Sequence, residues 1–241
     1  MTLHLISHQE NNRLYFDQEV AHHMVRSLRK QSGDLIQATD GEGNIFKAVI
    51  DSVDGKAVEA TILSQNYQDK KWKVHVACSL IKMESRFEYF LEKATEIGVH
   101  QITPLICERT FKPKLRQDRA QKIINSAVQQ SFNPYVPILD QPIRMEEYLC
   151  RSISAAHERH IATAVDRVEV PLLEQQYSGE NPVHILIGPE GDFTPAEVDA
   201  AIKVGWIPVS LGYNRLRTET AATMVVQIIK SCYHIKTQTT K

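Results

Sequence analysis

HILIGPEGDFTPAEVDAA (residues 184–201) and SLGYNRLRTETAA (residues 210–222) are the two stretches that decide the fold. Each joins a short apolar run to a glycine-containing loop and then to a helix start, which is the pattern of a strand–loop–helix unit. Two such units in succession predict loops at the carboxyl edge of a parallel sheet, where open α/β sheets bind ligands. Two ordinary strand-to-helix turns without a ligand are the alternative interpretation.

Signals for the ends of helices are clearest in the first unit. Thr194 is a candidate N-cap, Pro195 stands at the first helical position, and Glu197 completes a capping box. Gly205 predicts the end of this helix. The second unit predicts a helix from about Thr218 to about residue 235, with the tail fraying beyond it.

Composition is that of an ordinary globular protein. The chain has 241 residues, of which 42% are hydrophobic and 24% charged, enough for one large domain or two smaller ones. No apolar run approaches the roughly 20 residues of a membrane-spanning helix. The beginning, MTLHLISHQENN, lacks the basic and apolar regions of a signal peptide. We therefore expect a cytoplasmic protein without a membrane partner.

Metal-binding patterns are missing from the sequence. Four widely spaced cysteines form no CxxC pair, so buried free thiols are expected rather than disulfides or zinc ligands. The adjacent His22 and His23 point about 100° apart on a helix and do not readily share one ion. No metal site is predicted.

The first part of the chain, residues 1–68, predicts a small β-rich domain. Short apolar segments alternate with Asp-Gly turns, a pattern typical of hairpins in a small barrel. The expected strands are 3–6, 35–39, 45–50 and 57–63, with one helix at 17–28.

The second part, residues 74–241, predicts an α/β domain that follows a polar linker at 66–73. Strands and helices alternate along it, which favours a mostly parallel sheet with helices on both faces. The expected strands are 74–80, 101–107, 161–165, 183–187 and 207–211. The expected helices are 85–97, with Ser85 and Glu88 as a capping box, then 118–130, 145–152, 194–204 and 218–235; residues 171–182 predict a loop or an irregular helix.

Charge is nearly balanced, with a formal net charge of −1, but basic residues gather in local clusters. Local clusters can bind phosphate in a protein that is neutral as a whole, although solvated surface is the alternative for each cluster. The basic residues expected to contact phosphate are Arg26, Arg29, Lys30, Lys112, Lys114, Arg116 and Arg119.

Several common enzyme motifs are absent. The sequence has no GxxxxGK[ST] phosphate loop and no GxSxG nucleophile elbow, and GPEGDF does not match GxGxxG. The second loop places Arg215 and Arg217 just before a helix start, where unpaired backbone amides favour a polar or anionic ligand. For Thr218 and Glu219, helix capping alone is an equal alternative.

These motifs together resemble a known family. GPEGDF with TPAE, followed by LG…LRTETA, is similar to the ribosomal RNA small subunit methyltransferase E family of the SPOUT superfamily. Residues 23–29 with Gly33-Asp34 resemble the family's H…R-x-L-R…G-D segment. Residues 93–99 resemble KATELGV, and 104–109 resemble PL…ER. The similarity follows the family's order from about residue 22 to 222.

The resemblance implies a fold and an activity. We expect a PUA-like β-barrel that binds RNA, followed by a SPOUT domain with a trefoil knot at about residues 160–222, an exception to the general absence of knots. The family is a homodimer that uses S-adenosylmethionine to methylate N3 of one uridine in 16S ribosomal RNA within the assembled small subunit.

The cofactor is expected in three loops of the knot, held largely by main-chain atoms. These loops follow residues 161–165, 183–187 and 207–211. The residues implied are Thr163, Leu186, Gly188, Pro189, Glu190, Gly191, Leu211, Gly212, Leu216, Arg217, Thr218 and Thr220.

Catalysis at a uracil N3 requires loss of the N3 proton and stabilisation of the resulting charge. Arg217 or Arg109 is expected to stabilise that charge, and Glu96 or Glu190 to receive the proton. A structural ion pair between Glu96 and Arg109 is the alternative.

Three departures from the family pattern are visible. Asp192 replaces the final glycine of GPEGG, residues 213–214 replace the Pro-Arg of LGPR, and residues 132–133 replace the Gly-Arg of QSGR. If that last arginine binds RNA in relatives, one of Lys112, Lys114 and Arg116 must substitute for it. These changes leave two other interpretations open: a SPOUT enzyme that acts on another RNA or on a ribose 2′-OH, and a non-catalytic RNA-binding protein of ribosome maturation.

Overall fold

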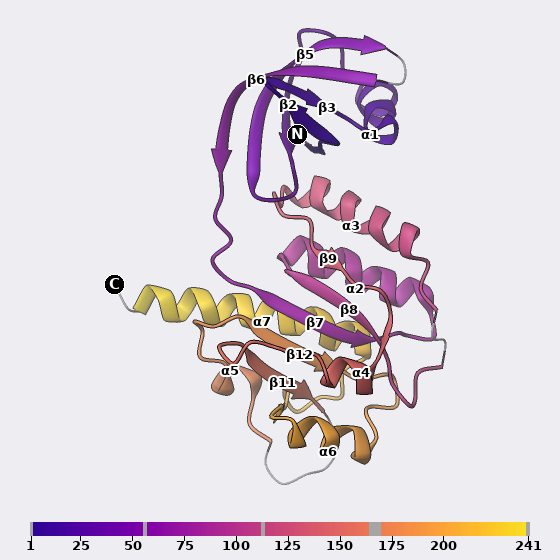
Figure 1. Ribbon diagram of the computed structural model, residues 1–241, viewed down its shortest axis with the longest axis vertical. Coiled ribbons are helices and arrows are strands. Elements are labelled where there is room, and N and C mark those ends of the chain that lie inside the picture. Colours follow the sequence, from indigo (N-terminus) through magenta and orange to yellow (C-terminus); the bar gives the residue numbers. More distant parts are fainter. Residues whose placement is uncertain (1, 55–56, 112–113, 164–169, 240–241) are drawn as a thin grey trace. The chain divides into compact units, whose positions relative to one another are not determined.

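The structure is a computed structural model that describes residues 2–54, 57–111, 114–163 and 170–239 (Figure 1). The chain divides into two compact units. One comprises Met1–Lys70 with Asn125–Val136, and the other Lys71–Ile124 with Pro137–Lys241. Searched over the described residues, no helix combines the length and hydropathy that a membrane span requires.

The first unit contains a curled six-stranded sheet with strand order β1-β4-β5-β6-β3-β2. All neighbouring pairs are antiparallel except β1 with β4. A short helix α1 (Gln18–His22) continues into a π-helical turn, η1 (His23–Ser27), and both pack on the barrel core around Met24 and Phe46. The strands are β1 (Leu3–Leu5), β2 (His8–Glu10), β3 (Arg13–Tyr15), β4 (Leu35–Thr39), β5 (Asn44–Asp54) and β6 (Ala57–Tyr67).

Sequence patterns missed parts of this unit. β2 and β3 were not predicted, because β2 is fully exposed and polar and β3 buries only Leu14. β5 and β6 are longer than predicted, since their polar ends pair with each other beyond the apolar segments. β6 therefore includes Asn66 and Tyr67, which we had expected to belong to the linker.

A segment distant in sequence completes the first unit. The carbonyl oxygen of Pro134 accepts hydrogen bonds from Gly43 N at 3.0 Å and from Thr39 Oγ1 at 3.0 Å. Val136 N donates to Gly41 O at 2.9 Å. These bonds attach residues 134–136 to the β4–β5 turn.

The second unit is built on a parallel sheet of seven strands. Its order is β10-β8-β7-β12-β11-β13, with β9 also paired to β8, and every pair is parallel. The strands are β7 (Val74–Ser79), β8 (Gln101–Ile106), β9 (Ile138–Leu139), β10 (Ile143–Arg144), β11 (Glu158–Ala162), β12 (Val183–Ile187) and β13 (Ile207–Val209).

Helices cover both faces of this sheet (Figure 1). α2 and α7 pack against each other, and α7 lies on β7 and β12. On the other face, α4 and α6 enclose a core that includes Ala77, Leu186 and Trp206. The helices of this unit are α2 (Glu84–Ile97), α4 (Met145–Leu149), α5 (Leu173–Gln176), α6 (Pro195–Lys203) and α7 (Thr218–Thr239), whereas α3 (Gln117–Ser131) begins in the second unit and ends in the first.

The capping signals had mixed outcomes. Thr194 and Glu197 form the predicted capping box of α6, and Gly205, with φ of 90°, follows its end. Ser85 is not a cap: α2 begins at Glu84 after Met83, without a side-chain cap hydrogen bond. Glu88, the expected capping partner, instead accepts hydrogen bonds from Arg119.

Other boundaries differ as well. β11 begins at Glu158, three residues before the expected strand, because its polar first residues pair with β12. The expected end of that strand, residues 164–165, lies outside the described residues. α7 continues to Thr239 where fraying was expected, and Cys150 is exposed rather than buried.

A buried histidine network lies near the amino ends of β7 and β12. His75 Nε2 lies 2.7 Å from Thr103 Oγ1, and Tyr148 Oη lies 3.3 Å from His184 Nδ1. His184 Nε2 lies 3.0 Å from His157 Nδ1. Burial lowers the pKa of His75 to about 2 and that of His184 to about 4, from an ordinary value of 6.5. Both rings are therefore neutral at pH 7.

We expect this network to make the fold sensitive to mild acid. In the folded protein the pKa values of both rings lie below 6.5. Their contribution to the free energy of unfolding is therefore fully present above pH 6.5 and is lost as the pH falls below it. His75 and His184 together should lower the free energy of unfolding by about 4 kcal/mol between pH 7 and pH 5, measured by chemical denaturation. In His75→Asn the loss over the same pH step should be smaller by about 2 kcal/mol. An equal loss in the variant would contradict this origin.

Candidate functional site

The second unit has a cleft of about 970 Å³ at the carboxyl edge of the sheet. The loops that follow β11, β12 and β13 form its walls, together with the residues after β7 and β8. Residues 184–201 and residues 210–222 both contribute to its lining. The sequence prediction of a shared edge site is consistent with this arrangement.

The glycine loop after β12 has a constrained backbone. Asp192 adopts φ of 60°, a left-handed conformation that favours glycine. Its Oδ1 accepts a hydrogen bond from Phe193 N at 2.7 Å, and its Oδ2 accepts one from Thr163 Oγ1 at 3.2 Å. The carboxylate therefore holds its own loop and links it to the residue after β11.

Gly188 fits this loop because it has no side chain. A Cβ atom there would lie 3.0 Å from Phe193 N and 3.1 Å from Asp192 Oδ1. Phe193 is fully buried in the core, so the backbone beside it has little room to move. A larger residue at 188 must displace the loop.

Three side chains attach the glycine loop and its helix to neighbouring loops. Arg109 Nη1 donates to Gly191 O at 2.6 Å, and Glu190 Oε1 accepts from Lys82 N at 2.9 Å. The buried carboxylate of Glu197 accepts from Thr194 N and from Glu108 N, each at 2.8 Å. These contacts preorganise the cleft from both sides.

The third wall leads into the amino end of α7. Gly212 has φ of 112° and open space where a Cβ would stand, while Ser210 Oγ accepts from Gly212 N at 3.2 Å. Arg217 is exposed at the cleft, and its side chain makes no hydrogen bond or ion pair to another described residue. Thr218 begins the helix, so its amide belongs to the unpaired first turn.

Arg86 contributes a further cation to the cleft. Its Nε lies 3.7 Å from Glu219 Oε1, and Glu219 Oε2 is buried without a hydrogen-bond partner among the described residues. Glu219 thus fixes Arg86 from the first turn of α7.

Most of the predicted cofactor residues line this cleft. Leu186 does not: it is fully buried in the sheet core, because inward-facing positions in the middle of β12 pack under α6. Thr220 is exposed but lies outside the cleft lining. The predicted residues that line it are Thr163, Gly188, Pro189, Glu190, Gly191, Leu211, Gly212, Leu216, Arg217 and Thr218.

Of the predicted catalytic residues, Arg217 and Arg109 line the cleft, but Glu96 does not. Glu96 lies near the end of α2, where it accepts a hydrogen bond from Lys93 Nζ at 2.9 Å. The alternative, an ion pair of Glu96 with Arg109, is wrong, since Arg109 donates to Gly191 instead. The acidic side chains at the cleft are Glu190 and Asp192, among the residues described.

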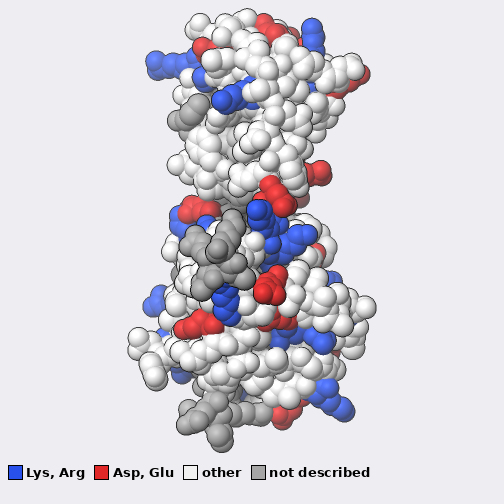
Figure 2. Space-filling model, turned by 90° about the vertical axis from the view of Figure 1, so that its left-hand side faces the viewer, with Lys and Arg blue, Asp and Glu red and all other residues white. Residues whose placement is uncertain are grey.

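The predicted RNA contacts fall into different surroundings. Arg26 and Arg29 are exposed at the end of η1, and Lys114 is exposed after β8. Arg116 pairs with Glu84 at 2.7 Å, and Arg119 forms a two-point pair with Glu88, so α2 neutralises both charges. Lys112 lies outside the described residues. On the face in Figure 2, the coloured basic side chains lie among acidic ones.

Sequence reading missed several lining residues. Arg86, Ala162, Ile187 and Ser210 line the cleft but were not predicted. Each stands at or just beyond the carboxyl end of a strand, or at the start of the helix that follows one. Ligands of open α/β sheets bind at the carboxyl ends of the parallel strands. Applying this rule to every predicted strand would have found these residues. Among the described residues, no group of three or more His, Cys, Asp or Glu side chains could hold a metal ion.

We expect Asp192 to stabilise the loop by its two hydrogen bonds despite its backbone strain. Asp192→Ala keeps the positive φ and removes both bonds, and should lower the free energy of unfolding by about 1–2 kcal/mol. Asp192→Gly removes the strain together with the bonds and should cost less. Denaturant unfolding measures both; a larger loss for Asp192→Gly would contradict this account.

Two family models match the chain. Residues 68–230 match the RNA methyltransferase domain, and residues 16–63 match the RNA methyltransferase PUA domain. A ribosomal RNA small subunit methyltransferase E of Synechocystis is 33% identical over 217 residues, covering 87% of this chain and 70% of that protein. The chain belongs to the ribosomal RNA small subunit methyltransferase E family.

Solved structures of methyltransferase E relatives have the same architecture. A Porphyromonas gingivalis protein described as a probable rRNA-methyltransferase has a TM-score of 0.89 at 33% identity, covering 98% of this chain and 100% of that one. Ribosomal RNA small subunit methyltransferase E of Neisseria gonorrhoeae, bound to S-adenosyl methionine, has a TM-score of 0.87 at 25% identity, covering 97% and 98%. The predicted fold class is confirmed: a SPOUT-type parallel sheet with helices on both faces follows a PUA-like barrel.

Two departures from the methyltransferase E pattern share one backbone feature. Phe132 and Asp192 stand where the pattern has glycine, and both have positive φ, 56° and 60°. This chain keeps the backbone conformation and accepts a strained residue in it.

Proposed function

We propose that this chain is an S-adenosylmethionine-dependent methyltransferase that modifies N3 of a uridine in 16S ribosomal RNA of the small subunit. The main support is the cleft itself: three loops at the carboxyl edges of β11, β12 and β13 meet around one cavity. Its volume of about 970 Å³ is ample for a nucleoside cofactor. Its backbone-rich loops fit the main-chain recognition that the family resemblance implies.

S-adenosylmethionine supplies an electrophilic methyl group when it is bound. The chain's own residues must therefore orient the target base, accept its proton and stabilise the charge left on its carbonyl oxygens. No metal enters the proposal.

Arg217 is the residue that we propose to stabilise the developing charge. Its guanidinium lies at the cleft beside the amino end of α7, where the helix dipole adds positive potential. Arg109 is better suited to positioning the glycine loop, because its Nη1 atom already donates to Gly191 O. For the proton acceptor, we favour Glu190 over Glu96, since Glu190 lines the cleft.

The domains have separate proposed roles. Residues 1–68 would bind RNA through the PUA-like barrel, with Arg26 and Arg29 as the leading phosphate contacts, and Lys114 of the second unit would add a further one. Residues 74–241 would carry the SPOUT domain, with the knot at about 160–222. As the resemblance implies, the working form would be a homodimer in the cytoplasm, acting on the assembled small subunit.

The proposal is tested by cofactor binding and label transfer. Calorimetry should detect binding of S-adenosylmethionine and none of NAD, and labelled methyl groups should pass to RNA of isolated small subunits. Binding without any transfer to ribosomal RNA would refute the proposed substrate and favour a protein that keeps the fold for another target.

A further inference from the structure

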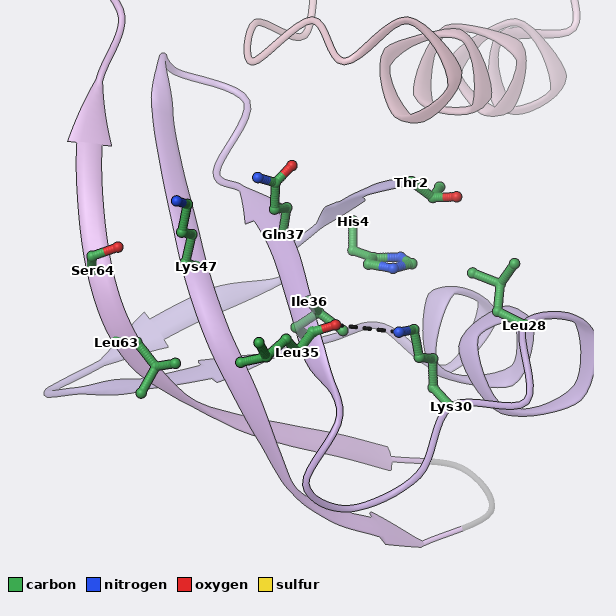
Figure 3. Close-up of a pocket in the computed structure, with 10 residues that line it drawn as sticks. All are labelled: Thr2, His4, Leu28, Lys30, Leu35, Ile36, Gln37, Lys47, Leu63 and Ser64. Atoms are coloured by element: carbon green, nitrogen blue, oxygen red, sulfur yellow. Dashed lines mark hydrogen bonds between the residues drawn. The ribbon is translucent and has the colours of Figure 1, made fainter.

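Two cavities of the chain differ in the charge of their walls. One, of about 510 Å³, lies in the barrel unit, where the charged lining residues are the cations Lys30 and Lys47 (Figure 3). Lys30 Nζ donates to Leu35 O at 3.2 Å, at the edge of this cavity. The carboxyl-edge cleft of the second unit also contains acidic side chains. A ligand that carries a positive charge is therefore better suited to the cleft than to the barrel cavity.

The acidic side chains of the cleft lie on one wall. Glu190 and Asp192, the carboxylates of its described lining, both belong to the loop after β12. Arg215 and Arg217 belong to the loop after β13, which leads into α7. The cleft therefore presents an anionic wall and a cationic wall to the molecule that it binds.

Asp192 has a defined place on the anionic wall. Its Oδ1 accepts a hydrogen bond from Phe193 N at 2.7 Å, and its Oδ2 accepts one from Thr163 Oγ1 at 3.2 Å. Both oxygens act as acceptors, as those of an ionised carboxylate do. A Cβ atom on Gly188 would lie 3.1 Å from Oδ1, so the carboxylate stands directly beside the backbone that lines the cleft. Its negative charge is therefore a fixed part of the binding surface.

The proposed cofactor and its product differ in charge. S-adenosylmethionine carries a positive sulfonium, and transfer of its methyl group leaves the bonding electron pair on sulfur. The product, S-adenosylhomocysteine, is the same molecule without the methyl group and without that positive charge. A carboxylate in the cleft wall attracts the sulfonium and has no such attraction for the neutral thioether.

We propose that Asp192 is a specificity-determining residue, whose charge makes the cleft prefer S-adenosylmethionine to S-adenosylhomocysteine. The proposal rests on the proposed function, because it requires that the cleft hold this cofactor. It assigns a role to a departure from the methyltransferase E pattern, which has glycine at this position. This chain should consequently be less sensitive to inhibition by its product than the same chain with glycine at 192.

Coulomb's law gives the expected size of the preference. A cleft of about 970 Å³ is roughly 10 Å across, which is an upper measure of the distance between Asp192 and the sulfonium. At that distance and an effective dielectric constant of about 20–40, one unit charge changes the affinity for another by about fivefold to fifteenfold.

Asp192→Asn removes the charge and keeps the shape of the side chain. The amide oxygen can accept from Phe193 N, the amide nitrogen can donate to the Thr163 hydroxyl, and asparagine tolerates the left-handed backbone at φ of 60°. Calorimetry measures Kd for S-adenosylmethionine, S-adenosylhomocysteine and sinefungin, an analogue with an ammonium group in place of the sulfonium. Relative to S-adenosylhomocysteine, the preference for each cationic ligand should fall about fivefold to fifteenfold in the variant.

Asp199→Asn is the matched control. It removes the same charge from an exposed position of α6 outside the cleft lining, so the preference should stay as it is in the wild-type protein. If Asp192 only shaped the loop, Asp192→Asn would change the three Kd values by one common factor. That result, or an unchanged set of Kd values, would overturn the proposal.

Failure of this proposal can be distinguished from failure of the proposed function. If wild-type protein methylates small subunits and the preference is unchanged in Asp192→Asn, the function stands and the role of Asp192 fails. If the preference falls as expected while wild-type protein transfers no methyl group to ribosomal RNA, the role of Asp192 stands and the proposed substrate fails.

Discussion

Arg217→Ala is expected to lower kcat for methyl transfer to small subunits by about 10²- to 10³-fold, the usual cost of removing one preorganised charge-stabilising group. The side chain lies at the cleft and is exposed, so its loss leaves no cavity in the core. Single-turnover transfer at saturating S-adenosylmethionine measures the effect on the chemical step, and calorimetry measures the smaller effect on cofactor affinity.

Two further variants define what Arg217 does. Arg217→Lys keeps the charge but loses the planar fork of donors, so it should recover only part of the rate. Lys203→Ala removes one positive charge from exposed α6, away from the cleft, and should leave the rate unchanged. Full activity in Arg217→Ala would remove Arg217 from the mechanism and leave Arg86 and Arg215 as the arginines of the cleft to test next.

Gly188→Ala should weaken S-adenosylmethionine binding by about tenfold, because the added Cβ forces a loop that is expected to hold the cofactor to move by a few tenths of an ångström. The added Cβ would meet Phe193 N at 3.0 Å, and the buried Phe193 ring prevents that backbone from yielding easily. The loop from Gly188 to Asp192 must then open away from its present position. Circular dichroism first shows that the variant is folded like the unchanged protein. Isothermal titration calorimetry then gives the change in Kd for S-adenosylmethionine.

Gly179→Ala is the matched control for this loop. Gly179 has φ of 86° and lies outside the cleft, where a Cβ would meet the flexible side chain of Lys236 at 2.5 Å. This variant should lose stability without losing cofactor affinity. Equal affinity of Gly188→Ala and the unchanged protein would show that the glycine loop does not hold the cofactor.

The parts of the fold that the sequence predicts are those encoded by local signals. Residues 183–187 form a strand with the predicted bounds, because a continuous apolar run there is buried on both faces of the sheet. Thr194, Pro195 and Glu197 begin α6 as predicted, since a capping box depends only on residues three positions apart. Because the strands are parallel, the loops that follow β11, β12 and β13 lie at the same carboxyl edge of the sheet.

What the sequence does not predict depends on contacts between distant residues. Glu88 has the spacing of a capping residue, but Arg119 of α3 binds it instead. The attachment of residues 134–136 to the β4–β5 turn rests on two backbone hydrogen bonds and one from the Thr39 hydroxyl, and these leave no recognisable pattern in the sequence. The sequence likewise left Glu96 and Glu190 open as proton acceptors, because similarity to a motif does not reveal which of the two side chains lines the cleft.

The most direct test of the central claim is the identity of the modified nucleoside. The protein is incubated with S-adenosylmethionine and intact small subunits, and the 16S RNA is digested and resolved by liquid chromatography with mass spectrometry. The account predicts N3-methyluridine, lost in Arg217→Ala. A 2′-O-methylated nucleoside, or no methylated nucleoside despite cofactor binding, would contradict it.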